Sequence, residues 1–263
     1  MHFVKTAVAA LVATASMGGY AADAAAEKSE SKWKADVAAG LVLERGNTNS
    51  NGASGNFNAS HEGELWRNTM KLEASNKEEK SEVTGYPGLE KYVRTDERYF
   101  GLYQLDRKFD SHSANYLFNV GTYEKDAFSG FQYQATYAVG LGRRWIDTET
   151  HTLDAELGPG YRWKCLEEED NYFQCDNDEN EAIVRVAAKY QWVISESADF
   201  RQEVSSDIGR DSTSTRAESI FNSKINSHFS LRLRYLLEHE SETAPGSKES
   251  DHEFTVGLVY TIR

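Results

Sequence analysis

Long hydrophobic runs are missing from most of this 263-residue chain. Beyond the first two dozen residues, no apolar stretch approaches the ~20 residues that a membrane-spanning helix needs. The mean hydropathy is strongly polar. These properties exclude a helical membrane protein. They leave a membrane β-barrel open, because the residues that face the inside of a barrel can be as polar as a water-exposed surface.

Proline, cysteine and positive charge are also scarce. Three prolines and an aromatic share of 12% suit a strand-rich chain, since proline interrupts ladders and aromatic rings suit pleated surfaces. The formal net charge is −13, so we expect no nucleic-acid partner, because its phosphates would be repelled. The acidic excess is concentrated in predicted loops, notably residues 167–170 and 176–181.

The N-terminus has the composition of an export signal. Lys5 precedes the apolar residues 8–13, and small residues fill positions 21–26. A basic start, a short apolar centre and small residues at a cut site predict a cleaved secretory signal over residues 1–24, with the cut after Ala21 or Ala24. The alternative is a short membrane anchor, but the apolar run is too short to span. A linker over residues 25–32 would follow.

A two-residue hydrophobic period fills the remainder of the chain. At the C-terminus, Phe254, Val256, Leu258, Tyr260 and Ile262 alternate with mostly polar residues. The same period recurs from Trp33 onward in about a dozen segments. We therefore predict an all-β chain whose residues 33–263 form a single antiparallel transmembrane β-barrel of about 12 strands. Two segments, 98–109 and 216–225, are ambiguous because their apolar residues do not select one face.

The predicted connections alternate in length. Short ones fall near residues 62–65, 110–113, 147–150, 195–198 and 226–227, and longer ones near 80–93, 165–181 and 242–250. Barrels of the outer membrane have short periplasmic turns and longer external loops, so we expect both termini in the periplasm. The remaining connections are short as well, which makes the asymmetry partial.

The inward-facing side of the predicted strands carries charges of both signs. Because a charge on the lipid side costs about 2–4 kcal/mol at the membrane midplane, these residues should line the lumen. They are Lys71, Glu73, Asp106, Arg144, Asp154, Glu156, Arg162, Arg185, Lys189, Arg201, Glu203, Arg232, Arg234 and Glu238. Mixed charges can line a narrow pore, or they can pair across a small lumen and close it. A twelve-stranded barrel is intermediate in size between eight-stranded barrels, which side chains fill, and porins of sixteen or more strands, which enclose a channel. The strand number therefore does not show whether the lumen is open.

Aromatic residues and glycines occur at informative positions. Large rings near strand ends are expected at the membrane interface. They are Trp33, Trp66, Trp145 and Trp192 on the periplasmic side, Trp163 on the other, and Tyr260. The alternative for the tryptophans is the core of a soluble β-sandwich. Inward-facing glycines, Gly140 and Gly142 among them, should relieve crowding, and Pro159 should mark a bulge or a strand end.

Other chemistry is weakly supported. Cys165 and Cys175 lie in one predicted loop of an exported protein, where we expect a disulfide rather than two free thiols. Asp176, Asp178 and Asn180 are similar to the start of a calcium loop, but the glycine and the final acidic ligand are missing, so we expect no metal site. The histidines lie mostly near turns without a catalytic signature, so we expect no enzyme and no cofactor.

Several stretches resemble a family of salt-induced outer-membrane proteins of Gram-negative bacteria whose biochemical function is unknown. The resemblance is carried by residues 46–49, 123–131, 140–144 and 158–162, and it extends over nearly the whole chain from Trp33. It implies an exported outer-membrane barrel linked to salt or envelope stress, and no catalytic residues. Barrel proteins commonly end on an aromatic residue that the insertion machinery recognises. This chain departs from that pattern, because its apolar alternation ends at Ile262 and Arg263 follows.

The function expected from these observations is a structural or narrow-pore role in envelope adaptation. Expected partners are outer-membrane lipid, lipopolysaccharide and the barrel-insertion machinery; the oligomeric state is left open. Three alternatives remain at this point. They are a non-conducting adhesion barrel that acts through its acidic loops, an outer-membrane hydrolase, and a soluble periplasmic β protein.

Overall fold

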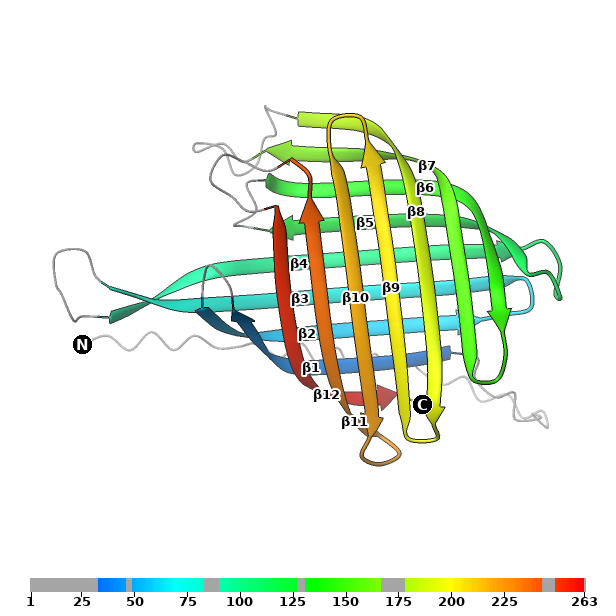
Figure 1. Ribbon diagram of the computed structural model, residues 1–263, viewed down its shortest axis with the longest axis horizontal. Helices are drawn as coiled ribbons and strands as arrows, with labels where there is room; N and C mark the ends of the chain where they lie inside the picture. Colours follow the sequence, from blue (N-terminus) through cyan, green and yellow to red (C-terminus); the bar gives the residue numbers. More distant parts are fainter. Residues whose placement is uncertain are drawn as a thin grey trace, which may run out of the picture. The chain divides into compact units, whose positions relative to one another are not determined.

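A closed barrel of twelve antiparallel strands forms the described part of the chain (Figure 1). The computed structural model describes residues 33–45, 49–82, 90–126, 131–166, 178–242 and 249–262. The expected export signal and linker, residues 1–32, lie outside the described residues. The predicted all-β class, the closed barrel and the strand number are confirmed.

The strands follow one another around the barrel in chain order. They are β1 Trp33–Arg45, β2 Asn49–Glu62, β3 Trp66–Glu82, β4 Glu90–Lys108, β5 Asn115–Asp126, β6 Phe131–Asp147, β7 His151–Leu166, β8 Asp178–Ser195, β9 Ala198–Gly209, β10 Thr213–Lys224, β11 Phe229–Glu240 and β12 Ser250–Ile262. The pairing of β1 with β12, from Ala35↔Ile262 to Leu43↔Phe254, closes the ring.

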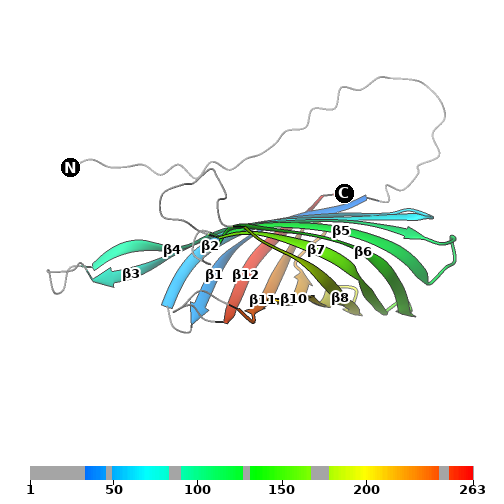
Figure 2. The ribbon, with the colours of Figure 1, turned by 90° about the horizontal axis from the view of Figure 1, so that it is seen from above.

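The strands of opposite walls run in different directions. In Figure 1, β3 to β6 cross β8 to β11 at a large angle. Strands in a closed barrel tilt by about 35–45° from its axis, so opposite walls cross at roughly twice that tilt. The longest strand is β4, with 19 residues, and its hairpin with the 17-residue β3 projects beyond its neighbours (Figures 1 and 2).

One end of the barrel carries the short turns, and we call it the short-turn end. Its turns are closed by backbone hydrogen bonds, such as Gly63 N–H to Trp66 O at 2.7 Å and Thr148 N–H to His151 O at 2.9 Å. The start of β1 and the end of β12 also lie at this end, because Ala35 pairs with Ile262. The opposite end, which we call the long-link end, includes connections 83–89, 167–177 and 243–248, outside the described residues.

The outer face of the barrel is apolar. Ten of the twelve strands expose large hydrophobic side chains there, for example Leu41, Leu141 and Leu258, which are 68%, 60% and 50% exposed. The other two strands, β2 and β10, present the half-buried Phe57 and Phe221. No helix in the described part of the chain has the length and apolarity that a membrane span requires. Because successive side chains of a strand point to opposite faces, the hydrophobic side chains lie on the outside of the barrel and the polar ones inside.

The two ambiguous segments each have a defined face in the structure. In β4, Arg98, Gln104 and Asp106 are buried in the lumen, and their alternate neighbours Tyr99 and Tyr103 are exposed. The inward side also carries Phe100 and Leu102, which explains why hydrophobicity alone did not select a face. In β10, Glu218, Ile220 and Asn222 are buried inside the barrel in the same way.

The inner face of β5 and β6 carries a small apolar cluster. Tyr116, Phe118, Val120 and Ala138 are buried there, and Leu102 packs against them. Glycines on β6 make room for the rings, because a Cβ at Gly142 would lie 2.2 Å from the ring of Tyr116.

Strand β7 continues through Pro159, so the expected bulge or strand end at this residue is wrong. The register to β6 is the same on both sides, at Leu141↔Leu157 and Ala138↔Gly160. The pairing of Pro159 with Val184 on β8 is uninterrupted. The irregularities of the β6–β7 ladder lie instead near the two ends of β6. The missing N–H of proline interrupts the ladder on one side only.

We predict that Gly158→Ala lowers the free energy of unfolding by about 1–3 kcal/mol, the usual cost of overpacking. Its Cβ would lie 2.2 Å from the backbone oxygen of Val139, which cannot move aside as a side chain can. Gly55→Ala is the matched control, because a Cβ there meets nothing within 4 Å. Urea unfolding of the purified barrel in detergent gives both values. Equal stability of the two variants would contradict the close approach of β6 and β7.

Candidate functional site

The lumen is the candidate functional site, because strand alternation gathers charged side chains from nearly every strand there. All fourteen residues that the sequence assigned to the lumen take part in ion pairs with other described residues. These pairs form three clusters and two local contacts near the long-link end.

The first cluster lies around Arg234 on β11, and we call it the central cluster. The Arg234 guanidinium donates to Glu73 on β3 at 2.7 Å, to Glu253 on β12 at 3.0 Å and to Glu218 on β10. Arg216 on β10 donates to the same Glu73 oxygen at 2.8 Å. Since β3 lies on the opposite wall from β10 and β11, Glu73 joins the two walls (Figure 1).

More bonds of the central cluster cross the lumen. Lys71 Nζ on β3 donates to Glu203 on β9 at 2.7 Å and to Glu218 on β10 at 3.2 Å. Arg98 on β4 donates to Glu238 on β11 at 2.5 Å, and Arg216 donates to the same Glu238 oxygen at 2.6 Å. Strands far apart in the ring are therefore held together by charge-assisted hydrogen bonds, which are about twice as strong as neutral ones.

The second cluster lies nearer the short-turn end. Arg67 on β3 donates to Asp106 at 2.6 Å and to Asp154 on β7 at 3.1 Å. Asp154 also accepts from Arg144 at 2.9 Å. A bridge from Gln104 on β4 extends this cluster to β7 and β8. The Gln104 amide donates to Glu156 at 2.8 Å and accepts from Lys189 Nζ at 2.6 Å.

The third cluster joins the strands on either side of the β1–β12 seam. Arg232 on β11 donates to Asp36 on β1 at 3.0 Å and to Asn222 on β10 at 2.8 Å. Asn58 on β2 donates to Asp36 at 3.0 Å, and Arg201 lies 3.6 Å from Asp199. These contacts continue the network across the closure of the barrel.

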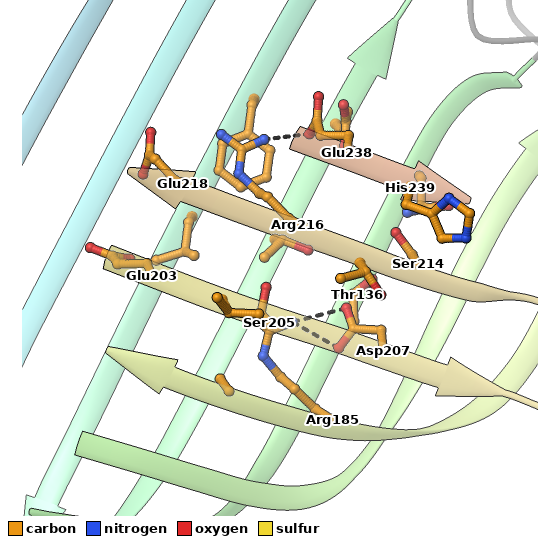
Figure 3. Close-up of a pocket in the computed structure, with 18 of the residues that line it drawn as sticks. Thr136, Arg185, Glu203, Ser205, Asp207, Ser214, Arg216, Glu218, Glu238 and His239 are labelled. Carbon is orange, nitrogen blue, oxygen red and sulfur yellow. Dashed lines mark hydrogen bonds and ion pairs between the residues drawn. The ribbon is translucent and has the colours of Figure 1, made fainter. Parts of the chain in front are cut away.

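Two contacts near the long-link end join neighbouring strands. Arg185 on β8 donates to both oxygens of Asp207 on β9 at 2.8 and 2.9 Å (Figure 3). Arg162 on β7 pairs with Glu181 on β8 and donates to the backbone oxygen of Ser212 at 2.7 Å. The second contact fixes the turn between β9 and β10 against β7.

Above the central cluster, a cavity of about 140 Å³ reaches toward the long-link end. Lys71, Lys189 and Glu203 line its deeper part, while Glu240 and Asp251 lie near the strand ends. Figure 3 shows how β8 to β11 present their polar side chains side by side along one wall. Eight carboxylate residues and four lysines or arginines line the cavity, and Arg98 and Arg234 from outside the lining pair with three of the carboxylates.

Burial makes this network energetically important. Arg234 is 3% exposed and Arg162 is 1% exposed. A buried charge costs several kcal/mol to desolvate, and only well-placed partners offset that cost. The opposite walls are therefore stabilised as a pair, since each wall supplies the countercharges of the other.

Several members of the network were missing from the sequence assignment. Arg98, Arg216 and Glu218 fall in the two segments whose facing was ambiguous. The further missed residues are Asp36, Arg67, Lys77, Glu124, Glu181, Asp199, Asp207 and Glu253. Residues an even number of positions apart on a strand face the same side. This rule, applied from the charges already assigned to the lumen, identifies most of the missed residues; Arg67, for example, lies four residues from Lys71.

The large rings lie on the outer surface near strand ends. Trp33, Trp66, Trp145, Trp192 and Tyr260 lie toward the short-turn end and are 40–65% exposed. Trp163 lies toward the long-link end and is 42% exposed. Their contact with a membrane interface stays a prediction.

The other expected chemistry concerns residues at the long-link end. Cys165 is buried at the end of β7, but Cys175 lies outside the described residues, so the disulfide stays a prediction. Asp176 lies outside them as well. Among the described residues, no group of three or more possible metal ligands comes together. The bonds Ser111–His112 and Ser227–His228 join sequence neighbours in exposed turns.

Comparison with solved structures shows a barrel fold of the porin type. The NanC porin matches 87% of this chain over its full length, with a TM-score of 0.53 and 11% identity. The KdgM porin matches 87% of this chain and 99% of its own, with a TM-score of 0.47 and 10% identity. At such identities the likeness concerns the fold alone.

Sequence comparison gives relatives without an assigned function. A family model described as "Protein of unknown function, DUF481" matches residues 37–262. The uncharacterized protein YdiY of Escherichia coli (strain K12) is 27% identical over 237 residues, covering 88% of this chain and 83% of YdiY.

We predict that Arg234→Met lowers the free energy of unfolding by about 3–5 kcal/mol, because it leaves three carboxylates without a shared cation. Arg210→Met is the control, since Arg210 is 92% exposed beside Asp211. That change should stay within about 0.5 kcal/mol. Urea unfolding in detergent measures both, and a similar small loss for the two variants would show that the central cluster does not stabilise the barrel.

Proposed function

Because this chain belongs to the DUF481 family, whose function is unknown, we propose a function from the lumen itself. The protein is a narrow channel of the bacterial outer membrane that favours small cations. The central cluster restricts its width. The observation that carries this proposal is a charged lumen whose width is restricted, but whose long-link end keeps a cavity, where Lys71, Arg98, Arg216 and Arg234 pair with carboxylates of the opposite wall.

Two features support a location in the outer membrane. The barrel fold is of the porin type, and its outer face is apolar on ten of the twelve strands while its lumen is charged. Lipid tails can cover such a surface, whereas water cannot do so without cost. Outer-membrane lipid, lipopolysaccharide and the insertion machinery are accordingly its proposed partners, with the short-turn end and both chain ends in the periplasm.

Two features support cation preference and low conductance. The cavity at the long-link end has twice as many carboxylates as basic residues in its lining. Deeper in the lumen, Lys71 reaches from β3 to β9 and β10, so the path is divided by side chains rather than open. A channel with this lining passes small ions better than large solutes.

The proposed physiological role is adaptation of the envelope. The narrower link to salt stress rests on the resemblance of the sequence to salt-induced outer-membrane proteins. The number of cross-wall ion pairs favours a second candidate, a barrel that is fully closed and serves a structural role. Conductance separates the two candidates.

We predict that Lys71→Ala combined with Glu203→Ala raises single-channel conductance in planar bilayers. The pair is removed without changing net charge, and Glu218 keeps Arg234 as its partner. Lys108→Ala with Glu62→Ala is the control, an ion pair at the short-turn end with 19% and 50% exposed side chains.

The unaltered protein should give small steps that select for cations over anions. The control pair should leave these steps unchanged. Absence of steps in the unaltered protein and in the Lys71/Glu203 variant would remove the channel proposal and support the closed barrel.

A further inference from the structure

The cavity at the long-link end has polar atoms that the protein leaves without partners. Gln134 on β6 is 8% exposed and Arg185 on β8 is 6% exposed, and both line the cavity. Among the described residues, Oε1 of Gln134, Nε of Arg185 and Oε2 of Glu240 are buried and have no hydrogen-bond partner. Buried polar groups are nearly always paired with protein, water or a ligand, so these three atoms mark a place where a molecule other than the protein supplies the partners.

The strand register brings two of these residues into one row. Arg185 pairs with Asp207, Asp207 with Ser214, and Ser214 with Glu240, so the row crosses β8, β9, β10 and β11. All four residues line the cavity. With neighbouring strands about 4.8 Å apart, the backbones of Arg185 and Glu240 lie roughly 14 Å from each other, which leaves room for a small molecule between their side chains.

The unpartnered atoms define the chemistry of that molecule. Gln134 Oε1 and Glu240 Oε2 are acceptors, so they require N–H or O–H donors. Glu240 is a carboxylate whose Oε2 has no partner among the described residues, so a positively charged donor suits it best. The Nε–H group of Arg185 is a donor and requires an oxygen. We infer that this cavity binds a small organic ammonium ion that also carries hydroxyl groups, such as an amino sugar.

The size and the remaining lining of the cavity suit this class of ligand. One water needs about 10–15 Å³ of such space, so about 140 Å³ accommodates roughly ten heavy atoms. The buried ring of Phe131 and the side chain of Leu102 supply an apolar surface for the C–H groups of a small ring. This inference goes beyond the channel proposal, because binding in the cavity does not require conduction.

Calorimetric titration of the purified protein in non-ionic detergent at low salt tests the inference with glucosamine and glucose. The two sugars have the same ring and the same number of heavy atoms, but glucosamine carries an ammonium group where glucose carries a hydroxyl. Glucosamine should bind at least about tenfold more tightly, since hydrogen bonds to a charged group are the stronger ones.

Variants locate the binding. Glu240→Gln and Gln134→Leu should each weaken glucosamine binding about tenfold, because each removes one acceptor. Glu242→Gln is the matched control, since Glu242 is exposed and outside the lining, and it should leave the affinity unchanged.

Urea unfolding of each variant shows that it is folded. No binding of glucosamine, equal binding of the two sugars, or equal affinities of the three variants would overturn the inference. Because no step of this experiment measures current, its outcome is separate from that of the bilayer recordings.

Discussion

Ion pairs between opposite walls of the barrel are the interaction on which the rest of the structure depends. Strand alternation places charges from nearly all strands in one small space, where each must find a countercharge. Glu73 accepts from Arg216 and Arg234 together, and Glu218 accepts from Lys71 and Arg234. The number and tilt of the strands set the distance between the walls, and these side chains are long enough to bridge it.

The same constraint organises the other features of the molecule. Charges that pair inside leave the outer face free to be apolar, as a lipid environment requires. Where β5 and β6 carry rings instead of charges, glycines such as Gly142 make the space for them. Toward the long-link end, the described residues leave a cavity that is lined by more carboxylates than basic residues and has buried polar atoms without partners. The narrow middle of the lumen and the proposed binding cavity at the long-link end thus both follow from where the inward-facing charges find partners.

The sequence predicts the fold better than it predicts the site. A two-residue period shows which residues face inward, so twelve strands and most lumen charges follow from it. The period does not show which strands supply the partner of an inward-facing charge. The partners of Arg234, for example, come from β3, β10 and β12. The apolar residues Phe100 and Ile220 also face inward, so hydrophobicity did not show that β4 and β10 direct Arg98, Arg216 and Glu218 into the lumen. The prediction of a bulge or strand end at Pro159 failed because a strand can lose pairing with one neighbour, here β6, and continue through its pairing with the other, here β8.

A double-mutant cycle between Arg216 and Glu73 tests the central claim most directly. These residues belong to β10 and β3, and their charged groups lie 2.8 Å apart. The free energies of unfolding of Arg216→Met, Glu73→Gln and the double variant should differ from additivity by more than about 0.5 kcal/mol, as for groups in one network. Additivity within about 0.3 kcal/mol would contradict the claim that the two walls are joined through the lumen.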